Sequence, residues 1–89
     1  VPWNRRGRLM FTLRIYTQAT GPNDPPSIEE DFERFPSAKG RLVELAEPNG
    51  ESIRKVYEDD TMVEYDLFKY NEKTFEHDFV ARAQIEEVK

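Results

Sequence analysis

The most regular pattern in the chain is the alternation of hydrophobic and polar side chains between Arg8 and Thr17. The hydrophobic set is Leu9, Phe11, Leu13 and Ile15. A period of two places these side chains on one face of a β-strand, whereas a helix would scatter them around its circumference. The pattern therefore predicts a first strand with one apolar face.

A short helix is predicted after the loop at residues 18–26, which is rich in glycine, proline, asparagine and aspartate. Ser27 and Glu30 have the spacing of a capping box at a helix start. The apolar side of this helix would comprise Ile28, Phe32 and Phe35. Pro36 would end it, and so short a helix is stable only when it packs on a sheet.

Two further strands, residues 41–47 and 52–57, are predicted on either side of Pro48-Asn49-Gly50. Asn-Gly is the strongest short-range signal of a tight β-hairpin, because it supplies the positive φ angles that the turn needs. We expect Asn49 and Gly50 to form the tip of this hairpin, where a partner protein could contact them.

Alternation returns in residues 61–70, with Val63, Tyr65 and Leu67 on one face. The acidic run at residues 58–60 and the polar run at residues 71–74 are predicted as the turns that flank this strand. Tight turns between consecutive strands indicate antiparallel pairing.

The segment from Phe75 to Val88 has three possible structures: one strand, a bent strand, or a part helix. As a helix it would spread its apolar residues over most of the circumference, so the pattern favours a strand. Such a strand would be longer than usual, and we expect a bend, a β-bulge or fraying of its end. It would place Phe75, His77, Phe79, Ala81, Ala83 and Ile85 on one apolar face, with His77 partly buried and hydrogen-bonded.

Together these elements predict an α+β fold with an antiparallel sheet of about five strands and one short helix packed on one face. The expected order is strand, helix, then four strands. The alternative is a small five-stranded barrel with the helix inserted in a loop. Residues 1–89 form a single domain in this interpretation, with a basic N-terminal arm at residues 1–7 and a folded, strand-rich body at residues 8–89.

The composition excludes several kinds of chemistry. The 89 residues contain no cysteine and one histidine, so thiol chemistry is absent and an ordinary zinc site lacks ligands. The four glycines are dispersed, which excludes a glycine-rich phosphate loop. We therefore predict no catalytic, cofactor-binding or metal-binding residues, and no enzyme activity. The carboxylates of Glu64 and Asp66 share a strand face, where basic side chains across the sheet are expected to neutralise them.

Cysteine-free composition also favours a cytoplasmic or other intracellular location, because small secreted domains usually carry disulfides. No apolar run approaches the roughly 20 residues that span a bilayer, so we expect a soluble protein without a membrane partner. The eleven aromatic residues supply the large buried areas that a small core needs.

Charge is distributed unevenly along the chain. Residues 1–20 carry four arginines and no acidic residue, whereas the rest carries nine basic and eighteen acidic residues, for a net charge of -5. The arm residues Trp3, Arg5, Arg6 and Arg8 are therefore predicted to bind a partner, or else to neutralise the acidic body.

The function that these observations favour is a non-catalytic protein-interaction module of a regulatory, accessory, inhibitor or immunity type, with another protein as its partner. The alternative is a nucleic-acid-binding domain that uses the arginine arm and exposed strand aromatics. The acidic body disfavours this alternative, because nucleic-acid-binding domains usually present a basic face.

Overall fold

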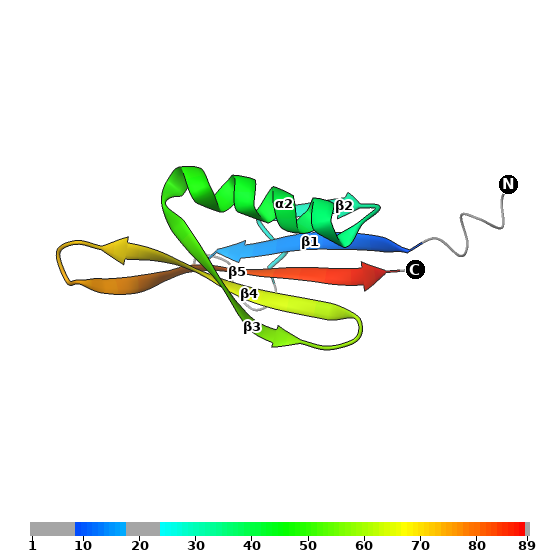
Figure 1. Ribbon diagram of the computed structural model, residues 1–89. Coiled ribbons are helices and arrows are strands. Elements are labelled where there is room, and N and C mark those ends of the chain that lie inside the picture. The colour runs from blue at the N-terminus through cyan, green and yellow to red at the C-terminus, as the bar shows by residue number, and fades with distance from the viewer. Residues whose placement is uncertain (1–8, 18–23, 89) are drawn as a thin grey trace, which may run out of the picture.

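The computed structural model describes residues 9–17 and 24–88, which form a five-stranded antiparallel sheet with one helix packed on one face (Figure 1). The elements in chain order are β1 (Met10–Thr17), β2 (Ile28–Phe32), α2 (Phe35–Ala46), the short 3-10 helix η1 (Glu47–Asn49), β3 (Glu51–Glu58), β4 (Met62–Asn71) and β5 (Glu76–Val88). The spatial order of the strands is β2-β1-β5-β4-β3. The predicted α+β class is confirmed. The alternative barrel is wrong, because the described part of the sheet is open, with β2 and β3 at its edges.

The strands predicted from alternation are present. β1 buries Leu13 and Ile15, and β4 buries Val63, Tyr65 and Leu67. β5 is a single strand of 13 residues that contains a β-bulge, as its length suggested. Its C-terminal part lies between β1 and β4. Because Val88 lies opposite Met10, the two termini of the described chain meet at one end of the sheet (Figure 1).

The helix predicted to start at Ser27 is wrong, because this segment is the edge strand β2. Ile28 and Phe32 fit both a helical and a strand period, and the strand gains a complete ladder with β1 from Phe32 to Ile28. The Ser27 N–H donates to the carbonyl of Ile15 at 2.8 Å and extends this pairing. Glu30 does not complete a capping box; its carboxylate binds Arg41 of α2 at 2.9 Å.

The helix lies further along the chain, where a strand was predicted at residues 41–47. Ala38, Leu42 and Ala46 follow one another at four-residue spacing, and all three are buried against the sheet. Pro36 sits in the first turn of α2 rather than ending a helix, since that position has no intrahelical hydrogen bond to lose. The observed order is thus two strands, the helix and three strands, not one strand, the helix and four.

Asn49 and Gly50 end the helical segment instead of turning a hairpin. The Asn49 side-chain amide donates to the carbonyl of Leu45 at 3.1 Å. Gly50 has a φ of 70°, and its N–H donates to the carbonyl of Glu47 at 2.9 Å. The same tolerance of positive φ that serves a hairpin turn also serves a helix C-terminus, so the dipeptide alone did not distinguish the two.

The core lies between α2 and the covered face of the sheet. Its buried members are Leu13, Ile15, Ala38, Leu42, Ala46, Val63, Tyr65, Leu67, Ala81, Ala83 and Ile85. Four of these are alanines, two on the helix and two on β5, and their small size lets the helix approach the sheet closely. The ammonium of Lys39 lies 4.8 Å from the centre of the Tyr65 ring and adds a cation–π contact between the layers.

Gly40 gives a direct test of the position of α2. It is exposed in the middle of the helix, and a Cβ there would meet no atom within 4 Å. We expect Gly40→Ala to raise the free energy of unfolding by about 1 kcal/mol in urea denaturation, because alanine favours the helix. Gly50→Ala should lower it by about 1 kcal/mol, because its φ is positive. If residues 41–47 were a strand, Gly40→Ala would not raise the free energy of unfolding in this way.

Candidate partner-binding surface

A single extra residue in β5 determines which face of the sheet its first half presents. Leu67 of β4 lies opposite Ala81, but the next residue, Phe68, lies opposite Phe79, so Val80 has no partner in the register. Such a β-bulge interrupts the alternation of side chains along the strand. Ala81 therefore faces the helix, while Phe79 lies beside Phe68 on the opposite, open face of the sheet.

Four ring side chains follow one another along this open face, and we call them the aromatic stripe: Phe68, Tyr70, His77 and Phe79. The rings of Phe68 and Phe79 meet edge to face with centroids 6.0 Å apart. Those of Tyr70 and His77 are 5.2 Å apart and tilted by 58°. Cross-strand ring pairs of this kind stabilise a hairpin, typically by about 0.5–1.5 kcal/mol beyond the burial of their area.

The predicted burial of His77 is wrong. Its side chain is exposed and contacts Tyr70 rather than the core. The prediction assumed strict alternation from Phe75 to Ile85, and the bulge at Val80 reverses the face of every residue before it.

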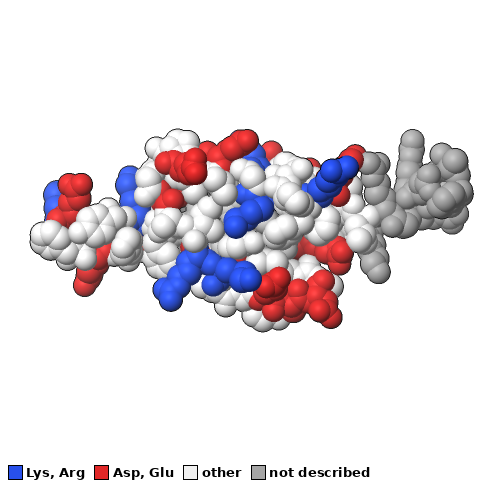
Figure 2. Space-filling model, viewed as in Figure 1, with Lys and Arg blue, Asp and Glu red and all other residues white. Residues whose placement is uncertain are grey.

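The aromatic stripe lies on a hairpin that extends beyond the rest of the sheet, which we call the projecting hairpin (residues 68–79; Figure 1, left). β3 pairs with β4 only as far as Lys69, and β1 pairs with β5 only from Ala81 onward. The end of the hairpin is therefore a two-stranded ribbon, a structure that is marginally stable on its own. In Figure 2 its tip is mainly uncharged surface, with acidic and basic side chains at its margins.

The tip of the projecting hairpin is an ordered turn. The side-chain oxygen of Asn71 accepts the N–H of Lys73 at 2.9 Å, and its amide donates to Asp78 at 3.0 Å. The carbonyl of Asn71 accepts the N–H of Phe75 at 2.8 Å. Phe75 has a φ of 60°, the one positive φ of a non-glycine among the described residues, and its side chain is 79% exposed.

Ion pairs link charged side chains of β2, β1, β5 and β4 on the open face over the body of the sheet. Arg82 of β5 binds Asp66 at 2.9 Å and lies 3.7 Å from Glu64. Both carboxylates therefore share one cation, which comes from the neighbouring strand β5. Arg14 of β1 binds Glu86 at 2.8 Å and Glu29 at 2.7 Å, and these hydrogen bonds raise its pKa above the ordinary value.

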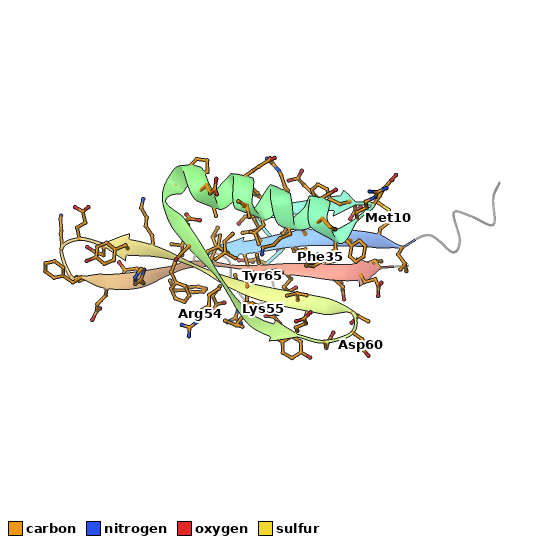
Figure 3. The ribbon with its side chains drawn as sticks, in the orientation of Figure 1. Met10, Phe35, Arg54, Lys55, Asp60 and Tyr65 are labelled. Atoms are coloured by element: carbon orange, nitrogen blue, oxygen red, sulfur yellow. The ribbon has the colours of Figure 1, made fainter. Side chains whose placement is uncertain are left out.

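The turn between β3 and β4 lies at the opposite end of the molecule from the projecting hairpin (Asp60 in Figure 3). The predicted turn is present one residue later, at residues 59–61, because Glu58 still pairs with Val63. Asp59 organises it. Its carboxylate accepts the Tyr57 hydroxyl at 2.6 Å and the backbone N–H groups of Thr61 and Met62 at 2.8 and 2.9 Å. These hydrogen bonds, with that of Tyr57 the largest cause, lower the pKa of Asp59 from 3.8 to about 2. The same hydrogen bonds hold the acidic turn in place.

Of the six residues that sequence analysis placed at a partner site, two lie within the described residues and four do not. Trp3, Arg5, Arg6 and Arg8 lie outside the described residues. Asn49 and Gly50 are exposed, and their contacts are those of a helix terminus. Sequence reasoning missed Phe75 as a surface residue, because it counted this side chain into the apolar face of the last strand. The sequence feature that indicates its exposure is its position directly after the polar run at residues 71–74.

The chain matches no protein-family model, and no curated protein or solved structure is significantly similar to it. Within residues 9–17 and 24–88, no three side chains of the metal-binding types cluster as ion ligands. No helix in the same residues is long and apolar enough to cross a membrane.

The depressed pKa of Asp59 predicts a specific acid sensitivity. A carboxyl group whose pKa is lower in the folded protein stabilises the fold above its ordinary pKa of 3.8, and this contribution is lost as the pH falls through about 2. Asp59→Asn keeps an oxygen acceptor but removes the charge. We expect the variant to be less stable at neutral pH, with a flatter profile of unfolding free energy between about pH 4 and pH 2.

The control for this prediction is Asp60→Asn, which removes the same charge from the same turn. It should leave the profile close to that of the unchanged protein in urea denaturation. Equal profiles for the two variants would contradict the assigned role of Asp59.

The conformation of Phe75 predicts that its removal stabilises the fold. Phe75→Gly relieves a left-handed conformation and loses little burial, so the free energy of unfolding should rise by about 0.5–1 kcal/mol. Thr74→Gly, one residue earlier and without a positive φ, should not raise it. A marked loss of stability in Phe75→Gly, measured by thermal and urea denaturation, would mean that the side chain packs within the fold.

Proposed function

We propose that this protein is a non-catalytic interaction module that binds another protein through the projecting hairpin. The observation that carries the proposal is Phe75, a large apolar side chain that is 79% exposed at the hairpin tip, in a conformation that favours glycine. Neither the exposure nor the positive φ helps the isolated domain to fold. Unfavourable backbone conformations of this kind cluster at functional sites.

The surroundings of Phe75 suit it to be an anchor. The Asn71 side chain accepts a hydrogen bond from Lys73 and donates one to Asp78, and both fix the turn, so binding would not have to order it. Tyr70, 47% exposed, extends the apolar surface along the aromatic stripe. Aromatic anchors that fill a pocket of the partner supply most of the free energy in many protein interfaces.

The charges on the projecting hairpin favour a protein partner over a nucleic acid. Lys69 and Lys73 alternate with Glu72, Glu76 and Asp78, so the hairpin has no basic face. On the adjoining sheet, acidic side chains bind Arg14 and Arg82. A phosphate backbone requires several unpaired basic groups along its path.

A photoreactive phenylalanine analogue at position 75 tests the proposal in the cells that make the protein. We expect a crosslink to one defined protein, and none from the same analogue at position 56, an exposed site on the edge strand β3. The purified partner should then bind Phe75→Gly at least about tenfold more weakly, because a buried aromatic anchor contributes about 2 kcal/mol or more. Val56→Ala, which trims another exposed hydrophobic side chain, should bind as the unchanged protein does.

Equal affinity of the partner for Phe75→Gly and the unchanged protein would refute the proposal. The stability measurement above excludes misfolding as the cause of a loss, because the same variant is expected to be more stable.

A further inference from the structure

A hollow of about 440 Å³ adjoins the projecting hairpin on the open face of the sheet. It is lined by Ser52 and Arg54 of β3, Phe68 of β4 and His77 of β5. The aromatic stripe runs into it, because Phe68 and His77 belong to both. A partner seated on the stripe would therefore extend a side chain toward this hollow.

Arg54 brings an uncompensated positive charge to the hollow. Asp66 lies directly opposite it in the register of β3 and β4, but the Asp66 carboxylate binds Arg82 at 2.9 Å instead. Arg54 itself forms no ion pair or hydrogen bond with any described residue, and Figure 3 shows it on the side of β3 away from α2. Its guanidinium thus has all five N–H donors available.

The other walls of the hollow restrict what this guanidinium would bind. The Phe68 ring, packed against Phe79, forms an apolar wall. The imidazole of His77 has an N–H donor in either neutral tautomer. The Ser52 hydroxyl already donates its hydrogen to the carbonyl of Phe68 at 3.3 Å, so it has no further hydrogen to donate to a ligand. An acidic group next to an apolar side chain matches this combination.

We infer that the partner inserts the carboxylate of an Asp or Glu side chain, flanked by a hydrophobic residue, into this hollow against Arg54. The inference rests on the proposed function, since it specifies the partner of the same hairpin. A single carboxylate matches one guanidinium in a bidentate pair. A dianionic phosphate fits less well, because Glu64 and Asp66 lie on the same open face of the neighbouring strand and the whole chain has a net charge of -5.

Selection of peptides from a library of random dodecapeptides displayed on phage tests this inference even while the partner is unidentified. Peptides selected on the unchanged protein should share an acidic residue next to an aromatic or aliphatic one. For such a synthetic peptide, Arg54→Gln should weaken binding about tenfold, as expected for loss of a charge-assisted hydrogen-bonded pair. Amidation of the peptide's acidic residue should weaken binding by the same factor. The two changes together should weaken binding no more than either change alone.

Arg34→Gln is the matched control. Arg34 is exposed, lies between β2 and α2 and has no ion pair among the described residues, so its replacement removes the same charge far from the hollow. Equal weakening by both arginine substitutions would overturn the inference, since it would indicate only the general effect of net charge. Competition by inorganic phosphate at concentrations where acetate has no effect would overturn it too.

The Phe75→Gly variant separates this inference from the proposed function. Suppose that the selected peptides bind Phe75→Gly more weakly but share no acidic residue, or bind Arg54→Gln as well as the unchanged protein. This result would refute the carboxylate site and leave the interaction module supported. Peptides that depend on Arg54 but not on Phe75 would support the hollow and count against the hairpin as the main anchor. A library that yields no binding peptide would count against both.

Discussion

The extra residue Val80 in β5 is the constraint on which the division of this molecule into two surfaces depends. Before the bulge, Phe79 and His77 share a face with Phe68 and Tyr70. After it, Ala81, Ala83 and Ile85 of β5 face the core instead. One strand thus serves both as the centre of a covered sheet and as half of an uncovered aromatic hairpin. Val80 itself packs against the core cluster, which holds the bulge in place.

The covered face and the hairpin have different sources of stability. Over the body, α2 covers the sheet through closely packed small residues, and ion pairs such as Arg82 with Asp66 connect neighbouring strands on the opposite face. The projecting hairpin has no helix and no neighbouring strands at its end, so the pairing of β4 with β5, the ring pairs and the hydrogen bonds of Asn71 hold it. A segment with few buried contacts opens more readily than the core, and such segments often carry binding function.

Alternation in the sequence was sufficient to predict β1, β4 and β5, because each buries one face and a one-residue slip would expose it. It failed where two patterns overlap. Ile28 and Phe32 fit the period of a strand as well as that of a helix, and pairing with β1 decided for the strand. Asn49-Gly50 fits a hairpin turn as well as a helix end, and packing of α2 on the core decided for the helix end. The side chains exposed on the projecting hairpin could not be predicted either, since no local sequence signal marks the bulge at Val80 that places Phe79 on the open face.

Proton–proton contacts between ring side chains in solution NMR test the central claim most directly. If the bulge aligns the two strands as described, nuclear Overhauser effects should connect the rings of Phe68 and Phe79, and those of Tyr70 and His77. The ring of Phe79 should show none to the side chain of Leu67, which lies on the covered face. Contacts from Phe79 to Leu67 or to α2, without contacts to Phe68, would mean that β5 alternates without interruption, and the aromatic stripe would not exist.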